Sequence, residues 1–351
     1  MNAIEDIAQR LRSQRGKVRL RGTGSRSHQL PTCASAEVLD LSPLNRIQRL
    51  DPGDQTCTVE CGVTRRELDA ALLEHDLELP CLSDHLDGTI GGLFASDPFG
   101  PAAAGCPGPR NLLLGMDALL ANGTSFRSGA RVVKSVAGFD VHKLLVGSLG
   151  RLFVATRLHL RLKPRPRAEQ WFSNQTDDLQ RALRLLQALR TERLPPTVLQ
   201  LRRERDGALH VSGRLTGRSV HVQALQQRHG LQGCAPPTSW QVHTDPALTE
   251  EVIRGMALPS ALDNLLKILP KDAPFTWLGG GRFEVALRDE PATDAVLEDL
   301  PKAKACGAIL IGTPSRRNQT NTKSWSTPMD SGEQRIAAGL KRALDPDDIL
   351  V

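Results

Sequence analysis

The sequence has few aromatic residues and no tyrosine. Aromatic side chains make up 3% of its 351 residues, and its net charge is a modest +6. Proteins that bind nucleic acids gather basic residues and aromatic rings on one face, where the rings stack on bases. Because such rings are scarce here, we expect no nucleic-acid partner, and a basic binder of polyanions remains only a distant third alternative.

Long apolar runs are also missing. No stretch approaches the roughly 20 apolar residues that a membrane-spanning helix needs, so we expect no transmembrane segment. Residues 1–15 are charged and place Ile4, Ile7, Ala8 and Leu11 on one helical face, which is unlike a signal peptide. We therefore expect a cytoplasmic protein.

The seven cysteines form no recognisable metal-binding motif. Cys57 and Cys61 share one face of a predicted strand, but no second pair or adjacent histidine completes a ligand set. Scattered cysteines of this kind are typical of small apolar side chains in a reducing compartment. We expect neither a metal site nor an iron–sulfur cluster in this chain.

The sequence is instead rich in glycine and proline between residues 88 and 109. Ten such residues fall within this segment: Gly88, Gly91, Gly92, Gly100, Gly105, Gly108, Pro98, Pro101, Pro107 and Pro109. Glycine permits positive φ and close approach of the backbone to a ligand. Long irregular segments in compact proteins are usually functional when they are ordered, so we interpret this one as part of a binding site.

Patterned elements follow this segment. Residues 112–120 are predicted to form a strand, Asn122-Gly123 a two-residue hairpin turn, and residues 140–146 a short helix. Residues 154–163 alternate between apolar and polar, which predicts a strand with one buried and one wet face.

The N-terminal part combines short strands with one well-marked helix. Residues 37–41, 47–50 and 56–61 are predicted strands, and Thr64 and Glu67 form a capping box that opens a helix through Leu73.

A strand over residues 17–21 leads into the small-residue turn 22–27. Such a turn can aim successive backbone N–H groups at a pyrophosphate, but an ordinary tight turn explains it equally well. It is not a Rossmann fingerprint, because the third glycine and the following helix are missing.

The prolines and charges at residues 165–167 indicate a domain boundary. Beyond it, short strands and helices are mixed, which predicts a second α+β domain. Asp206-Gly207 and Gly279–Gly281 are predicted turns. The helices are predicted over residues 177–189, 219–228, 292–300 and 333–344, and the strands over 198–202, 208–212, 283–287 and 308–311.

The central motifs carry a family resemblance. They occur in the order T-I-G-G, G-P, P-R-N, L-L-L-G, N-G, V-K-S-V-A-G-F-D, K-L-L-V-G-S-L-G and K-P-R-P. This order resembles the FAD-binding domain of the vanillyl-alcohol-oxidase (PCMH) type, and within it the small FAD-binding subunits of bacterial glycolate oxidases. The resemblance covers residues 18–166, and the string around residues 134–140 is its most specific part.

The resemblance implies an α+β fold. Residues 1–166 would form a PCMH-type FAD-binding domain of two α+β subdomains. Residues 167–351 would form a smaller α+β cap domain for substrate or subunit interaction, and the last helix is a candidate to return to the FAD domain.

The resemblance also implies bound FAD. Ser25 occupies the position of the histidine that attaches FAD covalently in some relatives, so we expect a non-covalent cofactor. Leu79-Pro80 would border it. The FAD-binding residues implied by the resemblance are Gly22, Thr23, Gly24, Ser25, Arg26, Ser27, Pro80, Gly88, Thr89, Gly91, Gly92, Gly100, Pro101, Arg110 and Val154.

The implied activity is oxidation of glycolate or a related small 2-hydroxy acid. Electrons would pass from FAD to a larger flavoprotein subunit and an iron–sulfur subunit, through which the chain could associate with a membrane. His85, His142 and His243 are candidate bases, and Arg110 and Lys134 are candidate carboxylate partners. No motif singles out any of them, so we predict no catalytic residue.

A non-catalytic scaffold is the alternative function. Phe153 stands where the family has a small residue against the flavin ring, and no base is identifiable. A scaffold subunit of the same complex would keep the fold and bind FAD weakly or not at all.

Overall fold

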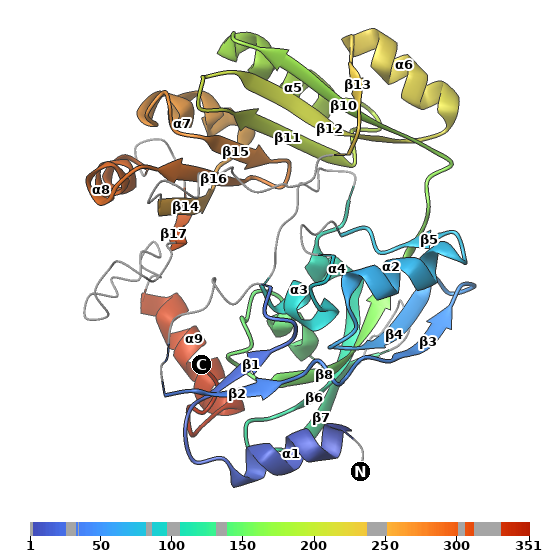
Figure 1. Cartoon of the computed structure of the whole chain (residues 1–351), viewed down its shortest axis with the longest axis vertical. Helices are drawn as coiled ribbons and strands as arrows, with labels where there is room; N and C mark the ends of the chain where they lie inside the picture. Colours follow the sequence, from blue (N-terminus) through green and yellow to red (C-terminus); the bar gives the residue numbers. More distant parts are fainter. Residues whose placement is uncertain are drawn as a thin grey trace. The chain divides into compact units, whose positions relative to one another are not determined.

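The structure is a computed structural model that describes residues 3–25, 33, 35–81, 86–96, 106–130, 139–236, 251–300, 306–311 and 331–351. The chain forms two compact units, shown with their elements in Figure 1. Unit 1 comprises residues 1–98, 107–165 and 329–351, and unit 2 comprises residues 99–106 and 166–328. Among the described residues, no helix is long and apolar enough to cross a membrane.

The main sheet of unit 1 has five antiparallel strands in the order β3-β4-β8-β6-β7. The strands are β3 (Ile47–Asp51), β4 (Thr56–Glu60), β8 (Val154–Arg161), β6 (Leu113–Leu119) and β7 (Ser125–Gly129). Helices α2 (Arg65–Leu73) and α3 (Ile90–Ser96) bury Leu68, Leu72, Ile90 and Phe94 in its core. The predicted capping box of α2 is confirmed, because Thr64 and Glu67 cap each other's backbone.

The prediction of a wet face on β8 is wrong. Ala155 and His159 are buried, Arg157 is half-buried, and only Arg161 is exposed. The strand lies between β4 and β6, whose polar side chains meet its own: His159 Nδ1 is 3.1 Å from Thr58 Oγ1, and Arg157 Nη1 is 3.3 Å from Asp117 Oδ2. Polar residues can be buried when they have such partners, so alternating polarity here does not mark solvent.

The hairpin between β6 and β7 is confirmed, but its connection is longer than the predicted two residues. It spans residues 120–124, closed by a hydrogen bond from Leu120 N to Thr124 O of 2.9 Å, with Gly123 at φ +77°. A Cβ on Gly123 would lie 2.5 Å from Ala8 O, so the turn packs directly on α1 (Ala3–Ser13). The helix expected at 140–146 is a 3₁₀ helix, η2 (Val141–Leu145).

Small elements complete unit 1 around these strands. Helix α1 buries Ile7, Ala8 and Leu11, as predicted. Leu112, expected in a strand, ends a short helix. The remaining elements are α4 (Pro109–Leu112) and two paired strands, β5 (Leu77–Glu78) and β9 (Lys163–Pro164).

The C-terminal residues join the N-terminal strand. Strand β1 (Val18–Arg21) pairs in parallel with β2 (Glu37–Asp40) on one edge. On its other edge, Val18 N donates to Ile349 O at 2.8 Å and Val351 N donates to Val18 O at 3.0 Å. Helix α9 (Ser331–Leu344) precedes this pairing, so the last residues of the chain hold the strand that leads into the 22–25 turn.

One buried carboxylate holds the C-terminal segment in place. The Asp345 side chain is 0% exposed, and its Oδ2 lies 2.5 Å from Lys341 Nζ. Asp345 also accepts backbone hydrogen bonds from Ile349 N (2.9 Å) and Leu350 N (2.8 Å). Lys341 Nζ donates in turn to Leu350 O, at 2.6 Å. These bonds shape the turn after α9.

Unit 2 contains an eight-stranded antiparallel sheet in the order β13-β10-β12-β11-β15-β16-β14-β17. Its strands are β13 (Gly233–Cys234), β10 (Ala168–Thr176), β12 (Leu209–Gly217), β11 (Val198–Arg203), β15 (Phe275–Leu278), β16 (Arg282–Leu287), β14 (Glu251–Met256) and β17 (Cys306–Ile311). The predicted turns at Asp206-Gly207 and Gly279–Gly281 connect β11 to β12 and β15 to β16.

The helices of unit 2 pack on the apolar face of this sheet (Figure 1). They are α5 (Leu179–Arg190), α6 (Ser219–His229), the 3₁₀ helix η3 (Pro259–Ala261), α7 (Leu262–Ile268) and α8 (Glu290–Asp299). Leu201, Trp277 and Phe283 from neighbouring strands meet Leu186 of α5 and Leu265 of α7 in one core. The result is a mixed α+β protein with one hydrophobic core in unit 2 and two in unit 1, one under the main sheet and one between α1, β1, β2 and the C-terminal residues.

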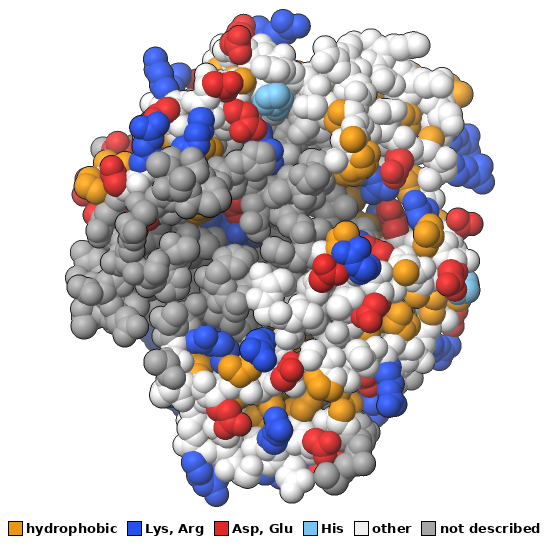
Figure 2. Space-filling model, viewed as in Figure 1, with side chains coloured by type: hydrophobic (Ala, Val, Ile, Leu, Met, Phe, Trp, Pro, Cys, Tyr) orange, Lys and Arg blue, Asp and Glu red, His pale blue; other side chains and the backbone are white. Residues whose placement is uncertain are grey.

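Charged side chains of both signs are interspersed over the described surface drawn in Figure 2. Several form exposed pairs, such as Arg66 with Asp87 at 2.7 Å. Exposed pairs of this kind contribute little to stability. On the face drawn in Figure 2, the described basic side chains do not gather into one patch.

Replacing Asp345 should destabilise the chain. In Asp345→Ala, two buried backbone amides lose their acceptor and the half-buried Lys341 ammonium loses its nearest carboxylate, which is expected to cost about 3 kcal/mol of unfolding free energy. Urea denaturation measures the change. Asp347→Ala is the matched control, because Asp347 is exposed and should change stability by less than about 0.5 kcal/mol. Equal stabilities of the two variants would contradict the role given to Asp345.

Candidate functional site

A cavity of about 270 Å³ opens in unit 1 where five segments meet. They are β1 with the turn that follows it, β2 with the residue after it, the residue after β4, helix α3 with Thr89 before it, and the stretch from η2 to the beginning of β8. The lining residues are Arg19, Leu20, Arg21, Gly22, Thr23, Gly24, Ser25, Val38, Leu41, Cys61, Thr89, Gly91, Gly92, Ala95, Ser96, Leu145, Leu149, Gly150, Phe153 and Ala155.

The turn after β1 supplies one wall. Gly24 has φ +79°, a conformation that favours glycine. Within the described part of the chain, the backbone amides of Gly22 and Thr23 have no hydrogen-bond acceptor. Amides in a turn of this kind are donors suited to an anionic group such as a phosphate.

The start of α3 supplies the facing wall. Thr89 Oγ1 accepts a hydrogen bond from Gly92 N at 3.1 Å, and Gly91 N donates to Cys61 O at 2.8 Å. A Cβ on Gly91 would lie 2.7 Å from Cys61 Cβ. The T-I-G-G sequence therefore allows α3 to begin directly against the end of β4.

The two walls are in close contact at Gly22 and Thr89. A Cβ on Gly22 would lie 2.4 Å from Thr89 Oγ1 and 2.6 Å from Thr89 Cγ2. Thr89 is 4% exposed and therefore cannot move aside into solvent. Only glycine at position 22 lets the turn and α3 approach this closely, and the approach defines the cavity.

The third wall carries two successive residues with positive φ, Leu149 at +54° and Gly150 at +77°. Leu149 N donates to Ala95 O at 2.8 Å, which ties this stretch to α3. A Cβ on Gly150 would lie 3.2 Å from Leu20 of β1.

The Phe153 ring is 1% exposed and packs edge-on against Phe126, with the ring centroids 5.6 Å apart. That ring therefore belongs largely to the core.

The structure brings together seven of the fifteen expected cofactor-binding residues: Gly22, Thr23, Gly24, Ser25, Thr89, Gly91 and Gly92. Four others are described but are not among the residues that line the cavity. Pro80 and Val154 are buried, the Gly88 carbonyl accepts a hydrogen bond from Arg65 N, and the Arg110 carbonyl accepts one from Lys143 Nζ. Arg26, Ser27, Gly100 and Pro101 fall outside the described residues, as do the candidates His85, Lys134 and His243.

Sequence reasoning missed the two arginines on the cavity wall. Arg19 and Arg21 alternate on β1 and frame the turn with positive charge. Their two-residue spacing directly before a glycine turn is the signal that could have identified them. Gly150 was likewise missed, although it ends the quoted string K-L-L-V-G-S-L-G.

The candidate base His142 lies outside the cavity wall. It is 2% exposed, and its Nδ1 lies 3.1 Å from Ser128 Oγ, which also accepts a hydrogen bond from His142 N. Burial, followed by the charge of Lys143, holds the pKa of His142 below its usual value. A neutral, buried imidazole with these partners has a structural role.

The residues present fit the phosphate part of the expected FAD. Glycines stand where a side chain would collide with the opposite wall, two arginines precede the turn on β1, and the Gly22 and Thr23 amides have no acceptor among the described residues. Gly22, Thr23, Gly24 and Ser25 would face the pyrophosphate, with Arg19 and Arg21 compensating its charge.

The sequence is also similar to known FAD-binding proteins. A family described as an FAD binding domain matches residues 1–129. Glycolate oxidase subunit GlcE of Escherichia coli (strain K12) is 29% identical over 279 residues, which cover 79% of this chain and 75% of that protein. D-lactate dehydrogenase of Archaeoglobus fulgidus is 32% identical over 146 residues, 42% of this chain but only 32% of that enzyme.

The fold also has a solved counterpart. A structure of alkyldihydroxyacetonephosphate synthase matches 99% of this chain and 73% of its own, with a TM-score of 0.72. The sequences are 14% identical, so this similarity concerns the fold alone.

The stability of the chain should decrease as pH falls below about 6.5. Because the pKa of His142 is depressed in the folded state, the unfolded state binds a proton that the folded state does not. The contribution of neutral His142 to the free energy of unfolding is fully present above the pKa of the unfolded state, about 6.5, and is lost as pH falls through the pKa of the folded state. In His142→Asn, urea denaturation at pH 7.5 and 5.5 should show a smaller difference than in the wild type.

The exposed His75 provides the matched control for this test. His75→Asn should keep the wild-type pH dependence, and an unchanged dependence in His142→Asn would assign the effect to other groups.

Proposed function

We propose that this chain, whose residues 1–129 match a family described as an FAD binding domain, is the FAD-binding subunit of an enzyme that oxidises glycolate or a related small 2-hydroxy acid. The similarity to glycolate oxidase subunit GlcE carries the proposal, because it extends over 79% of the chain and so includes both units. The second relative, a D-lactate dehydrogenase, is named for another small 2-hydroxy acid.

The FAD-binding residues of the proposal are the fifteen given above, with Arg19, Arg21, Leu149 and Gly150 added from the cavity wall. The bound flavin would accept hydride from C2 of the substrate, while the substrate hydroxyl loses a proton and a 2-oxo acid forms. The chain's own residues position the phosphates, and the buried Leu145 and Phe153 exclude water from the cavity.

We propose that the cofactor is bound non-covalently. Ser25 lines the cavity at the position of the attaching histidine of some relatives, and a serine hydroxyl cannot form the histidyl bond to a flavin. Flavin released into the filtrate on denaturation would support this, and flavin retained by the denatured chain would contradict it.

The partners of the proposal are a larger flavoprotein subunit and an iron–sulfur subunit. GlcE is named as a subunit, and the described residues of this chain hold no group of three potential metal ligands that could pass electrons onward. Unit 2 would bind substrate or these subunits.

A non-catalytic scaffold remains the second candidate, favoured by one observation. The described lining of the cavity contains no histidine, aspartate, glutamate or lysine that could act as a base. Anaerobic mixing with glycolate or D-lactate separates the two functions. Bleaching of the flavin absorbance by the isolated chain supports catalysis, whereas a stable oxidised spectrum supports the scaffold.

Substitution at Gly22 tests the cavity directly. In Gly22→Val the new side chain would collide with Thr89 and separate the two walls, so FAD affinity should fall at least about tenfold, equivalent to 1.4 kcal/mol. Flavin absorbance per chain after gel filtration, and titration of the apoprotein with FAD, measure the change. Gly339→Ala is the control, because a Cβ there meets no atom within 4 Å. Full FAD binding by Gly22→Val would rule out this cavity as the cofactor site.

A further inference from the structure

The sheet of unit 2 has a second face that is polar. Leu199 and Leu201 point into the core with the helices, so the alternating Gln200 and Arg202 point to the opposite side. At paired positions, one row of polar residues crosses six neighbouring strands: Gln175, His210, Arg202, Thr276, Glu284 and Arg254. Within it, Thr276 is 1% and Glu284 5% exposed, so much of this face is buried although it is not apolar.

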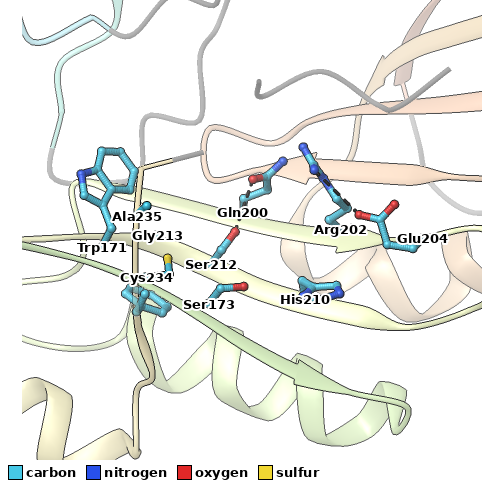
Figure 3. A pocket seen from close by; sticks show the side chains of 11 residues that line it. Trp171, Ser173, Gln200, Arg202, Glu204, His210, Ser212, Gly213, Cys234 and Ala235 are labelled. Atoms are coloured by element: carbon cyan, nitrogen blue, oxygen red, sulfur yellow. Dashed lines mark hydrogen bonds and ion pairs between the residues drawn. The ribbon is translucent and has the colours of Figure 1, made fainter. Parts of the chain in front are cut away.

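A pocket of about 290 Å³ lies on this face, formed by β10, β11, β12 and the residues that follow β13 (Figure 3). Trp171, Cys234 and Ala235 lie at one end, and Arg202, Glu204 and His210 lie at the other. The pocket therefore offers an apolar surface to a carbon chain and charged groups to a polar head.

The side chain of Gln200 lies between these ends and is 1% exposed. Its Oε1 accepts a hydrogen bond from Ser212 Oγ at 3.3 Å, which leaves the amide nitrogen as the group available to a ligand. Among the described residues, Gln200 Nε2 has no hydrogen-bond partner. A buried donor without an acceptor lowers the free energy of unfolding. We therefore take the unpaired amide of Gln200 at the pocket wall as a sign that a ligand supplies the acceptor.

Charged groups stand beside this donor. Arg202 Nη1 lies 3.8 Å from Glu204 Oε1, and the Arg202 side chain is 14% exposed. The guanidinium favours a carboxylate, and the Glu204 carboxylate can accept a hydrogen bond from a hydroxyl group. The Glu204 carboxylate would repel an anion, and a hydroxyl group that donates to it offsets this repulsion, so the pocket favours a molecule that carries both a carboxylate and a hydroxyl group.

We propose that this pocket binds a small hydroxycarboxylate. Its carboxylate accepts from Gln200 Nε2 and pairs with Arg202, its hydroxyl donates to Glu204, and its carbon chain lies against Trp171. The chemistry of the pocket rests on unit 2 alone. The choice of a 2-hydroxy acid as the occupant rests on the proposed function.

A ligand that cannot be oxidised tests the pocket separately from the reaction. 2-Hydroxy-2-methylpropanoate has no hydrogen on C2, so it can bind the complete FAD-loaded chain without turnover. Isothermal titration calorimetry should detect binding, and 2-methylpropanoate, which lacks the hydroxyl, should bind more weakly. Gln200→Met keeps the length of the side chain and removes the donor, so affinity should fall at least about tenfold, the loss expected for one hydrogen bond to a charged group.

Two controls distinguish a binding role from a structural one. Gln223→Leu alters an exposed glutamine on α6 and should bind like the wild type. Because Gln200→Met removes an unsatisfied buried donor, its Tm should equal or exceed that of the wild type, whereas a purely structural glutamine would lower Tm and leave affinity unchanged. If Gln200→Met fails to fold, Ser212→Ala should still weaken binding several-fold, because the amide loses its fixed orientation.

The outcomes separate the two proposals. Wild-type affinity in both Gln200→Met and Ser212→Ala, or no binding by the wild type, would overturn the pocket even if the chain binds FAD. Ligand binding by a chain that takes up no FAD would support the pocket and overturn the proposed function.

Discussion

The close approach of Gly22 to Thr89 is the constraint on which unit 1 depends. It sets the separation between the turn after β1 and the start of α3, and the cavity lies between them. Other contacts maintain it: the C-terminal residues pair with Val18, and Leu149 is hydrogen-bonded to the end of α3. Segments that are far apart in the sequence thus maintain the contact between Gly22 and Thr89. Any side chain at position 22 would collide with Thr89 and prevent this contact.

Both units bury polar side chains on sheet faces that alternation would assign to water. In unit 1, His159 and Arg157 of β8 find partners on the flanking strands, so burial is compatible with stability. In unit 2, Gln200 remains without an acceptor among the described residues. What singles out Gln200 is the combination of a buried amide nitrogen without a partner and a place on the wall of a pocket, because there a ligand can reach the donor.

Several elements follow from local sequence. Thr64 and Glu67 cap α2 because their side chains reach backbone groups three residues away, and the apolar spacing in residues 3–13 predicts the buried face of α1. The small residues of the 22–27 turn suggested a phosphate site but equally an ordinary turn, and the resemblance supplied Gly22 to Ser25, Thr89, Gly91 and Gly92 as candidate site residues. Arg110 and Val154 came from the resemblance, and the structure leaves them away from the cavity wall.

The sequence by itself determined the α+β composition, the helix caps, the hairpins and the small-residue turns, since each depends on residues within a few positions of one another. The tertiary structure alone decided that β8 is buried on both faces, that the C-terminal residues pair with β1, and that Arg19 and Gln200 line cavities. Such features depend on which strand becomes a neighbour, and periodicity along one segment carries no information about the partner across the sheet.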